Sequence, residues 1–256
     1  MIKITFLGTG TSQGIPVIGS DHPVSFSDDL KDKRLRSSIL IEYKDFNFVI
    51  DCGPDFRQQM LRTNCRKLDA IIFTHEHADH TTGIDDVRPY FFRQGKIPIY
   101  LHERVLNSLH NRFAYIFDPK QKYPGAPDFE VNLITKENDF QILGLNITPI
   151  EAVHYKLPVL GFRLGKFAYL TDVKTISDKE MLKLNGLDTL VINALRYESH
   201  PSHLNIEEAL EIIDQVKPKQ TFFTHISHNM GFHEEVCRSL PKSVSLAFDG
   251  LVLEVD

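Results

Sequence analysis

Residues 74–80 constrain the fold and chemistry of this chain more than any other stretch. They read THEHADH, so four potential metal ligands, His75, His77, Asp79 and His80, fall within six residues. The apolar run at residues 70–73 directly precedes them. A strand ending in that run would place the ligands at the carboxyl edge of a sheet, where α/β enzymes keep their chemistry. In an extended turn His75 and His77 would point to the same side, because side chains alternate along extended backbone.

The types of these side chains favour a metal site. Three imidazoles and a carboxylate suit zinc, manganese or iron better than calcium, which prefers oxygen ligands only. A polar surface loop is the alternative in a chain with 12 histidines. The number and spacing of the ligands favour the metal site over that alternative.

This stretch resembles the His-x-His-x-Asp-His signature of the metallo-β-lactamase superfamily. The resemblance continues at His154, Asp172 and His225, which follow apolar runs at residues 145–150, 167–171 and 220–224. They stand in the order of the superfamily's third histidine, bridging aspartate and last histidine. The resemblance implies that one metal ion is held by His75, His77 and His154. It implies that a second is held by Asp79, His80 and His225, and that Asp172 bridges the two.

The resemblance also implies a fold and a reaction. The expected fold is a four-layer αββα sandwich of the α/β (α+β) class, built as one domain over residues 1–256. The expected cofactors are two divalent ions, zinc or manganese, with iron possible. Two ions about 3.5–4 Å apart can share a hydroxide, lower its pKa and clamp the attacking and leaving oxygens, which suits phosphodiester hydrolysis. Thiolesters and β-lactams remain possible substrates, because the same centre polarises carbonyl groups.

Three further stretches narrow the resemblance to a branch. Residues 6–17 (FLGTGTSQGIPV), 224–228 (THISH) and 248–250 (FDG) look like the phosphoribosyl 1,2-cyclic phosphate phosphodiesterases of the carbon–phosphorus lyase pathway. The similarity to the tRNA 3′-processing endonucleases is more distant. Because the Lys-Ser/Thr ending of a P-loop is missing, residues 8–14 are interpreted as a turn beside the active site and not as a phosphate cradle.

The chain departs from that branch in two places. A Cys-x-Cys-x-x-Cys motif, which binds a structural zinc in this branch together with His228, is replaced by Ser20, His22 and Ser25. Serines are poor substitutes for thiolates, so a third metal is not expected, unless Asp21 or Asp28 completes a weak site with His22 and His228. Asn193 stands where the phosphodiesterases carry a carboxylate beside the catalytic histidine. An amide can orient a neighbour but cannot take up a proton.

The candidate catalytic residues are Asp79, His203 and His200. His203 precedes a helix whose start is marked by a capping box, Asn205 with Glu208. The catalytic histidine of the tRNA-processing relatives has the same place, so His203 is the first candidate for the proton donor. His200 is the second, and a surface location is the alternative for both.

Periodicity predicts the main elements. Strands are expected at the start of the chain and in hairpins at residues 38–42 with 47–50, 159–164 with 167–170, and 244–248 with 251–255. Helices are expected at residues 55–64, with Phe56, Met60 and Leu61 inward, at 103–112, and after Asn205. A helical turn at residues 83–89 should be stopped by Pro89. The aromatic segment 113–139 is either a lid or subunit contact, or packing over one helix.

Composition limits the classes of function. The net charge of −5 gives no electrostatic reason to expect nucleic-acid binding. The first residues lack the apolar core and cleavage site of a signal peptide, and no run approaches 18 apolar residues. Three widely spaced cysteines argue against a disulfide framework. A cytoplasmic protein is therefore expected. Cys52 should be buried and inert.

The expected function is a phosphodiesterase for a small or cyclic nucleotide-like diester, with a homodimer as a possible assembly. The alternatives are tRNA 3′ processing, for which no inserted basic arm is present, and a non-catalytic metal-binding sensor or assembly protein.

Overall fold

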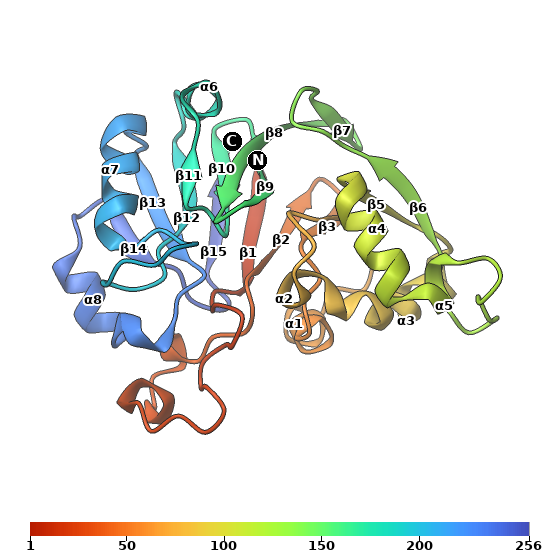
Figure 1. Ribbon diagram of the computed structural model, residues 1–256, viewed down its shortest axis with the longest axis horizontal. Coiled ribbons are helices and arrows are strands. Elements are labelled where there is room, and N and C mark those ends of the chain that lie inside the picture. The colour runs from red at the N-terminus through yellow and green to blue at the C-terminus, as the bar shows by residue number, and fades with distance from the viewer. Residues whose placement is uncertain (256) are drawn as a thin grey trace.

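Two β-sheets face each other, and helices cover their outer sides (Figure 1). The computed structural model describes residues 1–255. The strands of the first sheet, in spatial order, are β15 (Val252–Val255), β1 (Ile2–Gly8), β2 (Ser38–Tyr43), β3 (Phe46–Ile50), β4 (Ala70–Ile72), β5 (Ile97–Leu101) and β6 (Phe129–Leu133). Those of the second are β11 (Thr175–Ile176), β8 (Leu145–His154), β9 (Leu157–Leu164), β10 (Phe167–Leu170), β12 (Thr189–Asn193), β13 (Gln220–Thr224) and β14 (Val244–Leu246), and β7 (Phe140–Ile142) pairs with β8 beside this path.

The helices fall into two groups, one for each sheet. Beside the first sheet lie α1 (Phe56–Thr63), α2 (Ala78–Thr81), α3 (Arg88–Gln94), α4 (Glu103–Arg112) and α5 (Ala114–Phe117). Beside the second lie α6 (Asp178–Met181), α7 (Ile206–Val216) and α8 (His233–Ser239) (Figure 1). Short 3-10 helices occupy Pro23–Phe26, Leu30–Asp32, Thr82–Val87, Leu182–Leu184 and His228–Met230.

Three separate hydrophobic cores confirm the four-layer αββα architecture. The central core joins the inner faces of the two sheets, with Phe6 and Ile41 on one side and Phe162 and Tyr169 on the other. A second core packs alternate residues of the first sheet against α1, α3 and α4. The third packs the second sheet against α7 and α8. Central strands such as β4, β10 and β12 therefore bury both of their faces, which explains their nearly continuous apolar runs in the sequence.

Most predicted elements are confirmed. The β2–β3 and β9–β10 hairpins form in the expected places, with Phe167 opposite Leu164 in the second. The helix predicted at residues 103–112 has those bounds. The α7 capping box is complete, because Asn205 Oδ1 accepts from the Glu208 amide and Glu208 Oε2 accepts from the Asn205 amide. Cys52 is fully buried, and all three cysteines are free.

The predicted C-terminal hairpin is wrong, because its two strands lie in different sheets. β14 runs parallel to β13, whereas β15 pairs antiparallel with β1. The corner between them is held by Asp249, whose carboxylate accepts from Thr9 Oγ1 and from the Leu35 amide, both at 2.8 Å. These partners belong to the segments around β1 and β2, so the Asp249-Gly250 turn crosses between the layers.

Two local predictions around the helices are also corrected. Pro89 does not stop a helix; it lies in the first turn of α3, where a residue without an amide hydrogen is tolerated. In α1, Phe56 and Met60 are buried as predicted, but Leu61 is 64% exposed. Leu61 directly follows the buried Met60, and consecutive helical residues lie about 100° apart around the axis, so Leu61 points away from the sheet.

The aromatic segment after α4 packs over the helical layer. Phe113, Tyr115 and Phe117 lie against the core beneath α4, and the Tyr115 hydroxyl donates to Asp85 Oδ1 at 2.8 Å. Tyr123 stacks on Tyr115 with ring centroids 6.0 Å apart. This agrees with the packing interpretation of residues 113–139. Within residues 1–255, no helix combines the length and the apolar character that a membrane crossing needs.

Candidate metal centre

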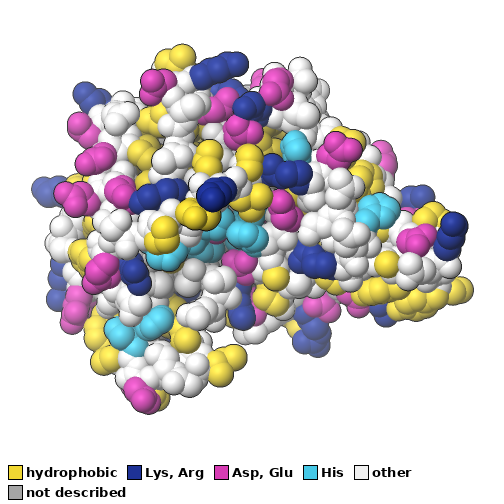
Figure 2. Space-filling model, viewed as in Figure 1, with side chains coloured by type: hydrophobic (Ala, Val, Ile, Leu, Met, Phe, Trp, Pro, Cys, Tyr) yellow, Lys and Arg dark blue, Asp and Glu magenta, His cyan; other side chains and the backbone are white. Residues whose placement is uncertain are grey.

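The predicted ligands meet at one end of the two sheets, in a histidine-rich hollow near the middle of the face in Figure 2. They follow the carboxyl ends of β4, β10 and β13, and His154 is the last residue of β8. Three groups of side chains each bring their donor atoms within 4.8 Å of one another. These groups are His75, His80 and Asp172; Asp79, His80 and His225; and His154, Asp172 and His203.

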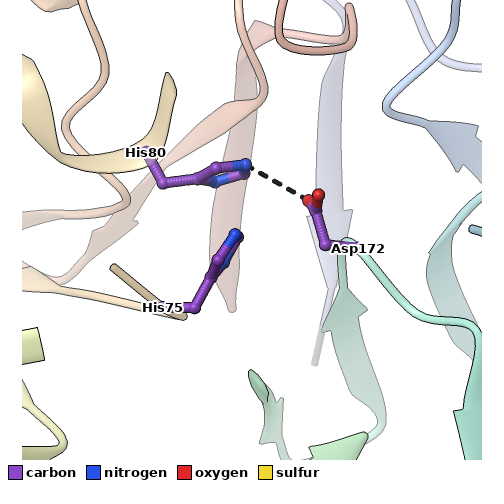
Figure 3. Close-up of side chains that lie close together, drawn as sticks. All are labelled: His75, His80 and Asp172. Carbon is purple, nitrogen blue, oxygen red and sulfur yellow. Dashed lines mark ion pairs between the residues drawn. The ribbon is translucent and has the colours of Figure 1, made fainter. Parts of the chain in front are cut away.

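Thr74 and Asp51 orient the first two histidines. Asp51 accepts from the Thr74 amide at 2.9 Å and from the Thr74 hydroxyl at 2.8 Å. The Thr74 hydroxyl proton is therefore committed to Asp51, and its oxygen accepts from His75 Nδ1 at 2.9 Å. His80 Nδ1 donates at 2.7 Å to Asp51 Oδ2, the same oxygen that accepts from the Thr74 hydroxyl. Both histidines thus turn Nε2 toward Asp172 (Figure 3).

The two Nε2 atoms provide the test of whether a metal fits. Both are buried, and neither has a hydrogen-bond partner. His80 Nε2 lies 3.1 Å from Asp79 Oδ2 and 3.2 Å from Asp172 Oδ2. Buried polar nitrogens without partners are rare, and here they face carboxylates across a short gap. This donor set fits a cation, which would satisfy both kinds of ligand at once.

The remaining histidines come from the second sheet, except for His77. His154 donates from Nδ1 to the Ser202 carbonyl at 2.7 Å, which leaves its Nε2 free and 3.9 Å from Asp172 Oδ1. His225 lies between Thr11, with Oγ1 3.0 Å from Nε2, and Asp172, with Oδ2 3.2 Å from Nδ1. His77 is exposed at the rim, and its ring centroid lies 4.7 Å from that of His75 and 5.1 Å from that of His154.

Asn193 fixes the backbone beside Asp172. Its Oδ1 accepts from the Val173 amide at 2.6 Å, and its Nδ2 donates to the Val173 carbonyl at 3.0 Å. Asp172 itself has a positive φ of 60°, which is unusual for a residue other than glycine. The Asn193 amide therefore orients a neighbouring turn, the one that carries the bridging candidate Asp172. A carboxylate at residue 193 could not donate the second of these hydrogen bonds.

The charges of the buried side chains at this site favour the binding of a cation. Burial alone would lower the pKa of His80, but Asp79, Asp172 and Asp51 together raise it well above its usual value. Burial lowers the pKa of His75 and of His225, which keeps both imidazoles in the neutral form that binds metals. Three carboxylates around one buried imidazole leave an excess of negative charge for metal ions to neutralise.

The proton-donor candidates lie on the loop before α7. His203 is buried, and its Nδ1 has no hydrogen-bond partner and lies 3.8 Å from Asp172 Oδ1. The ring of His200 is further out, 5.1 Å from that of His203. Burial, followed by the neighbouring His225, lowers the pKa of His203 to about 2, and the opposing effect of Asp172 does not offset this. For His203 to be protonated near neutral pH, a bound phosphate would therefore have to supply most of the negative charge.

Asp51, which directly follows the predicted strand at residues 47–50, was not among the residues predicted for the site. Its side chain is fully buried and its φ is +67°. The turn that follows Asp51 packs tightly against residues 74–80, which we call the metal loop. A Cβ on Gly53 would lie only 2.1 Å from the Asp79 carbonyl oxygen. A carboxylate directly after a predicted strand and two residues before a glycine was the available signal.

We expect Asp51→Asn to weaken metal binding about 10–100-fold, because outer carboxylates that orient metal-binding histidines have effects of this size. Competition with a fluorescent chelator measures the affinity. Asp69→Asn is the matched control, since Asp69 accepts only from the Asn47 amide and pairs with Lys67 away from the site. A folded Asp51→Asn variant with unchanged metal affinity would show that the Thr74–Asp51 network does not position the ligands.

His22 and His228 lie side by side at the place of the third metal site, which is not expected from the sequence unless Asp21 or Asp28 completes it. Their ring centroids lie 5.2 Å apart, and His228 Nδ1 is buried without a partner. Ser20 Oγ accepts from the His22 amide at 3.1 Å, so this serine supports the local turn. In the described part of the chain, no carboxylate or thiolate completes a group of three ligands there.

Comparison with known proteins decides the family. The sequence profile of the beta-lactamase superfamily domain matches residues 46–226, which is more than half of the chain. The chain belongs to the beta-lactamase superfamily. The match includes the metal loop, His154, Asp172 and His225, and the resemblance drawn from these residues is confirmed.

The crystal structure of a diphosphatase from the PhnP family places this superfamily member in the expected branch. It is 39% identical, the alignment covers 100% of this chain and 98% of that one, and the TM-score is 0.93. An octanoyltransferase from Porphyromonas gingivalis is 38% identical over 257 residues, which are 100% of this chain and 52% of that protein. The chain thus spans about half the length of that relative.

A ribonuclease Z from Methanococcus maripaludis is also similar. It is 31% identical over 211 residues, covering 72% of this chain and 60% of the ribonuclease. The diphosphatase therefore resembles this chain over a larger share of both proteins than the ribonuclease does.

Proposed function

We propose that this protein is a dinuclear metal-dependent phosphodiesterase that hydrolyses a small or cyclic nucleotide-like phosphodiester. The observation that carries the proposal is that neighbouring ligand groups share members. Asp172 is a member of two of the three ligand groups, the one that contains His75 and the one that contains His154. His80 is likewise a member of two groups, the one with His75 and the one with Asp79. Adjacent groups with common ligands suit two neighbouring cations, one of them held partly by Asp79, His80 and His225. Asp172 is assigned as the bridge between them.

The assigned ligands are five imidazoles and two carboxylates: His75, His77, His80, His154, His225, Asp79 and Asp172. This mixture supports zinc or manganese, with iron as a further candidate, and disfavours calcium and magnesium, which prefer oxygen. Bound there, two such ions would polarise the phosphoryl oxygens and lower the pKa of an attacking water. The chain itself supplies rigid orientation, through Asp51 and Thr74 on one side and the Ser202 carbonyl on the other.

His203 is assigned as the proton donor to the leaving group. It lies beside Asp172, on the same loop as His200, where a group leaving from a phosphate held next to Asp172 would depart. Geometry supports His203 over His200, because His203 is the one whose ring reaches the ligand cluster, with centroids 4.5 Å from His154 and 4.8 Å from His225. Asp79 would act through metal binding.

A second candidate function is tRNA 3′ processing, which the similarity to the ribonuclease Z supports. The proposal prefers a small diester because the diphosphatase resembles the chain over its whole length. The net charge of −5 also gives no electrostatic attraction for RNA in general. A homodimer and a cytoplasmic location stay predictions from the sequence.

Turnover of bis(p-nitrophenyl) phosphate by metal-loaded protein tests the proposed function. We expect release of p-nitrophenolate that stops on chelation and returns on adding zinc or manganese. His75→Ala should reduce it by more than the roughly 10–100-fold of an outer-ligand change, because it removes a direct ligand. Asp69→Asn should leave it unchanged. Protein that binds two ions but hydrolyses neither this diester nor ribose cyclic phosphates would be a metal-binding sensor and not a phosphodiesterase.

A further inference from the structure

The turn directly after the ligand His154 presents an aromatic ring to the active site. Tyr155 and Lys156 join β8 to β9, and His154 pairs with Leu157 across them. The hairpin is therefore tight, and Tyr155 directly follows the metal-ligand candidate His154. Tyr155 has a φ of +59°, where glycine or asparagine is the usual residue. Its side chain is 63% exposed and belongs to none of the three cores, so packing does not explain its presence.

This turn forms one wall of a cavity of about 590 Å³ that opens from the metal centre. His77 and His154 line its inner end, Tyr155, Lys156 and Leu157 line one wall, and Pro201 and Ser202 line the other. Figure 2 shows hydrophobic and basic side chains directly beside the histidine cluster. The volume of the cavity lies within the range of roughly 300–1,000 Å³ that is typical of small-molecule sites.

The cavity lies on the leaving-group side of the proposed reaction. Its second wall, Pro201 and Ser202, is the part of the chain between His200 and His203, and the Ser202 carbonyl anchors His154. A proton donor on this loop meets the leaving oxygen, so whatever is attached to that oxygen extends between the loop and Tyr155. The leaving group is therefore the part of the substrate that this cavity selects.

The chemistry of the wall favours a flat aromatic group. Lys156 Nζ lies 5.3 Å from the centroid of the Tyr155 ring, so the cation occupies one side of the ring. Any of the nucleobases can stack on an exposed aromatic side chain, because each base has a π-face. A bare sugar phosphate offers no such face and would leave the ring in water.

We propose that Tyr155, oriented by Lys156, is a stacking platform for the nucleobase of the leaving group, so that the substrate is a nucleoside phosphodiester and not a bare sugar phosphate. This inference rests on the proposed function and specifies its substrate class. Tyr155 acts in binding and has no part in the chemical step.

A matched pair of substrates isolates the base. Adenosine 2′,3′-cyclic phosphate and methyl riboside 2,3-cyclic phosphate carry the same cyclic ester, and only the first carries a base. Wild-type protein should show a KM about tenfold lower for the adenosine compound, the size expected for one stacked base. Tyr155→Asn should abolish that preference, and asparagine accepts the positive φ and so keeps the hairpin.

Two variants serve as controls. Tyr155→Phe keeps the ring and should keep the preference. Tyr123→Asn removes an exposed tyrosine that does not line the cavity, and it should change neither KM. Thermal unfolding of Tyr155→Asn should occur at the wild-type temperature or above it. An unchanged preference in folded Tyr155→Asn, or an equal rise of both KM values, would overturn the stacking platform.

Calorimetry separates this inference from the proposed function. Adenosine 3′-monophosphate should bind wild-type protein and Tyr155→Phe about tenfold more tightly than Tyr155→Asn, whereas methyl riboside 3-phosphate should not distinguish them. If this pattern appears without hydrolysis of either cyclic ester, the stacking platform stands and the proposed phosphodiesterase fails. If both esters are hydrolysed without any dependence on the base, the phosphodiesterase stands and the platform fails.

Discussion

Replacing Asp172 by alanine is expected to release at least one metal ion and to remove most hydrolysis. The carboxylate lies 3.2 Å from His80 Nε2 and from His225 Nδ1, and 3.9 Å from His154 Nε2, so it is close to ligands of both proposed ions. Losing a shared anionic ligand should reduce metal-binding free energy by on the order of several kcal/mol. Elemental analysis after gel filtration and turnover of bis(p-nitrophenyl) phosphate measure the two effects.

Asp188→Ala is the control for this experiment, because Asp188 directly precedes β12 and forms ion pairs with Lys166 and Lys219 at the surface. It should keep full metal content and full turnover. An Asp172→Ala variant with the same metal content and rate as Asp188→Ala would remove Asp172 from the bridging position.

His203→Ala is expected to affect substrates according to their leaving groups. General acid catalysis typically contributes about 10²–10⁴-fold, and it matters little when the leaving group is already a stable anion. Hydrolysis of ribose cyclic phosphates, whose leaving groups are alkoxides, should therefore fall by about this factor. Hydrolysis of p-nitrophenyl esters should fall far less. Steady-state rates on both substrates, with metal content measured on the same samples, provide the comparison.

The pattern of losses identifies what His203 does. Equal losses on both substrates would indicate phosphate binding, and a loss of metal would indicate that His203 supports the ligand cluster. His200→Ala is the companion variant, since His200 is more exposed and more distant from Asp172. If His203→Ala changes neither rate and His200→Ala produces the leaving-group dependence, the proton donor is His200.

The parts of the molecule that the sequence predicted are those that depend on local pattern. Ligands after apolar runs marked the strand ends of β4, β10 and β13, because parallel neighbours bring their carboxyl ends to one edge. Asn205 with Glu208 marked the start of α7 through contacts three residues apart. The metal loop carries four candidate ligands within six residues, so its metal-binding role could be predicted without knowing the rest of the fold.

The parts that were not predicted depend on contacts between distant segments. Asp51 orients His80 from 29 residues away, and Asn193 holds the Val173 backbone from 20 residues away. The course of the chain after β14 is set by Asp249, whose partner Thr9 is 240 residues distant. No local period or propensity encodes such pairs. Asp172 and His225 also adopt positive φ angles that the surrounding fold imposes on them.

The metal content of the protein tests the central claim most directly. Elemental analysis of protein purified without added chelator should find close to two ions per chain, and His75→Ala or Asp172→Ala should lower that number. Three tightly held ions, one of which is lost selectively in His22→Ala without loss of turnover, would show that His22 and His228 form a further site. One ion or none in fully active protein would contradict the dinuclear centre.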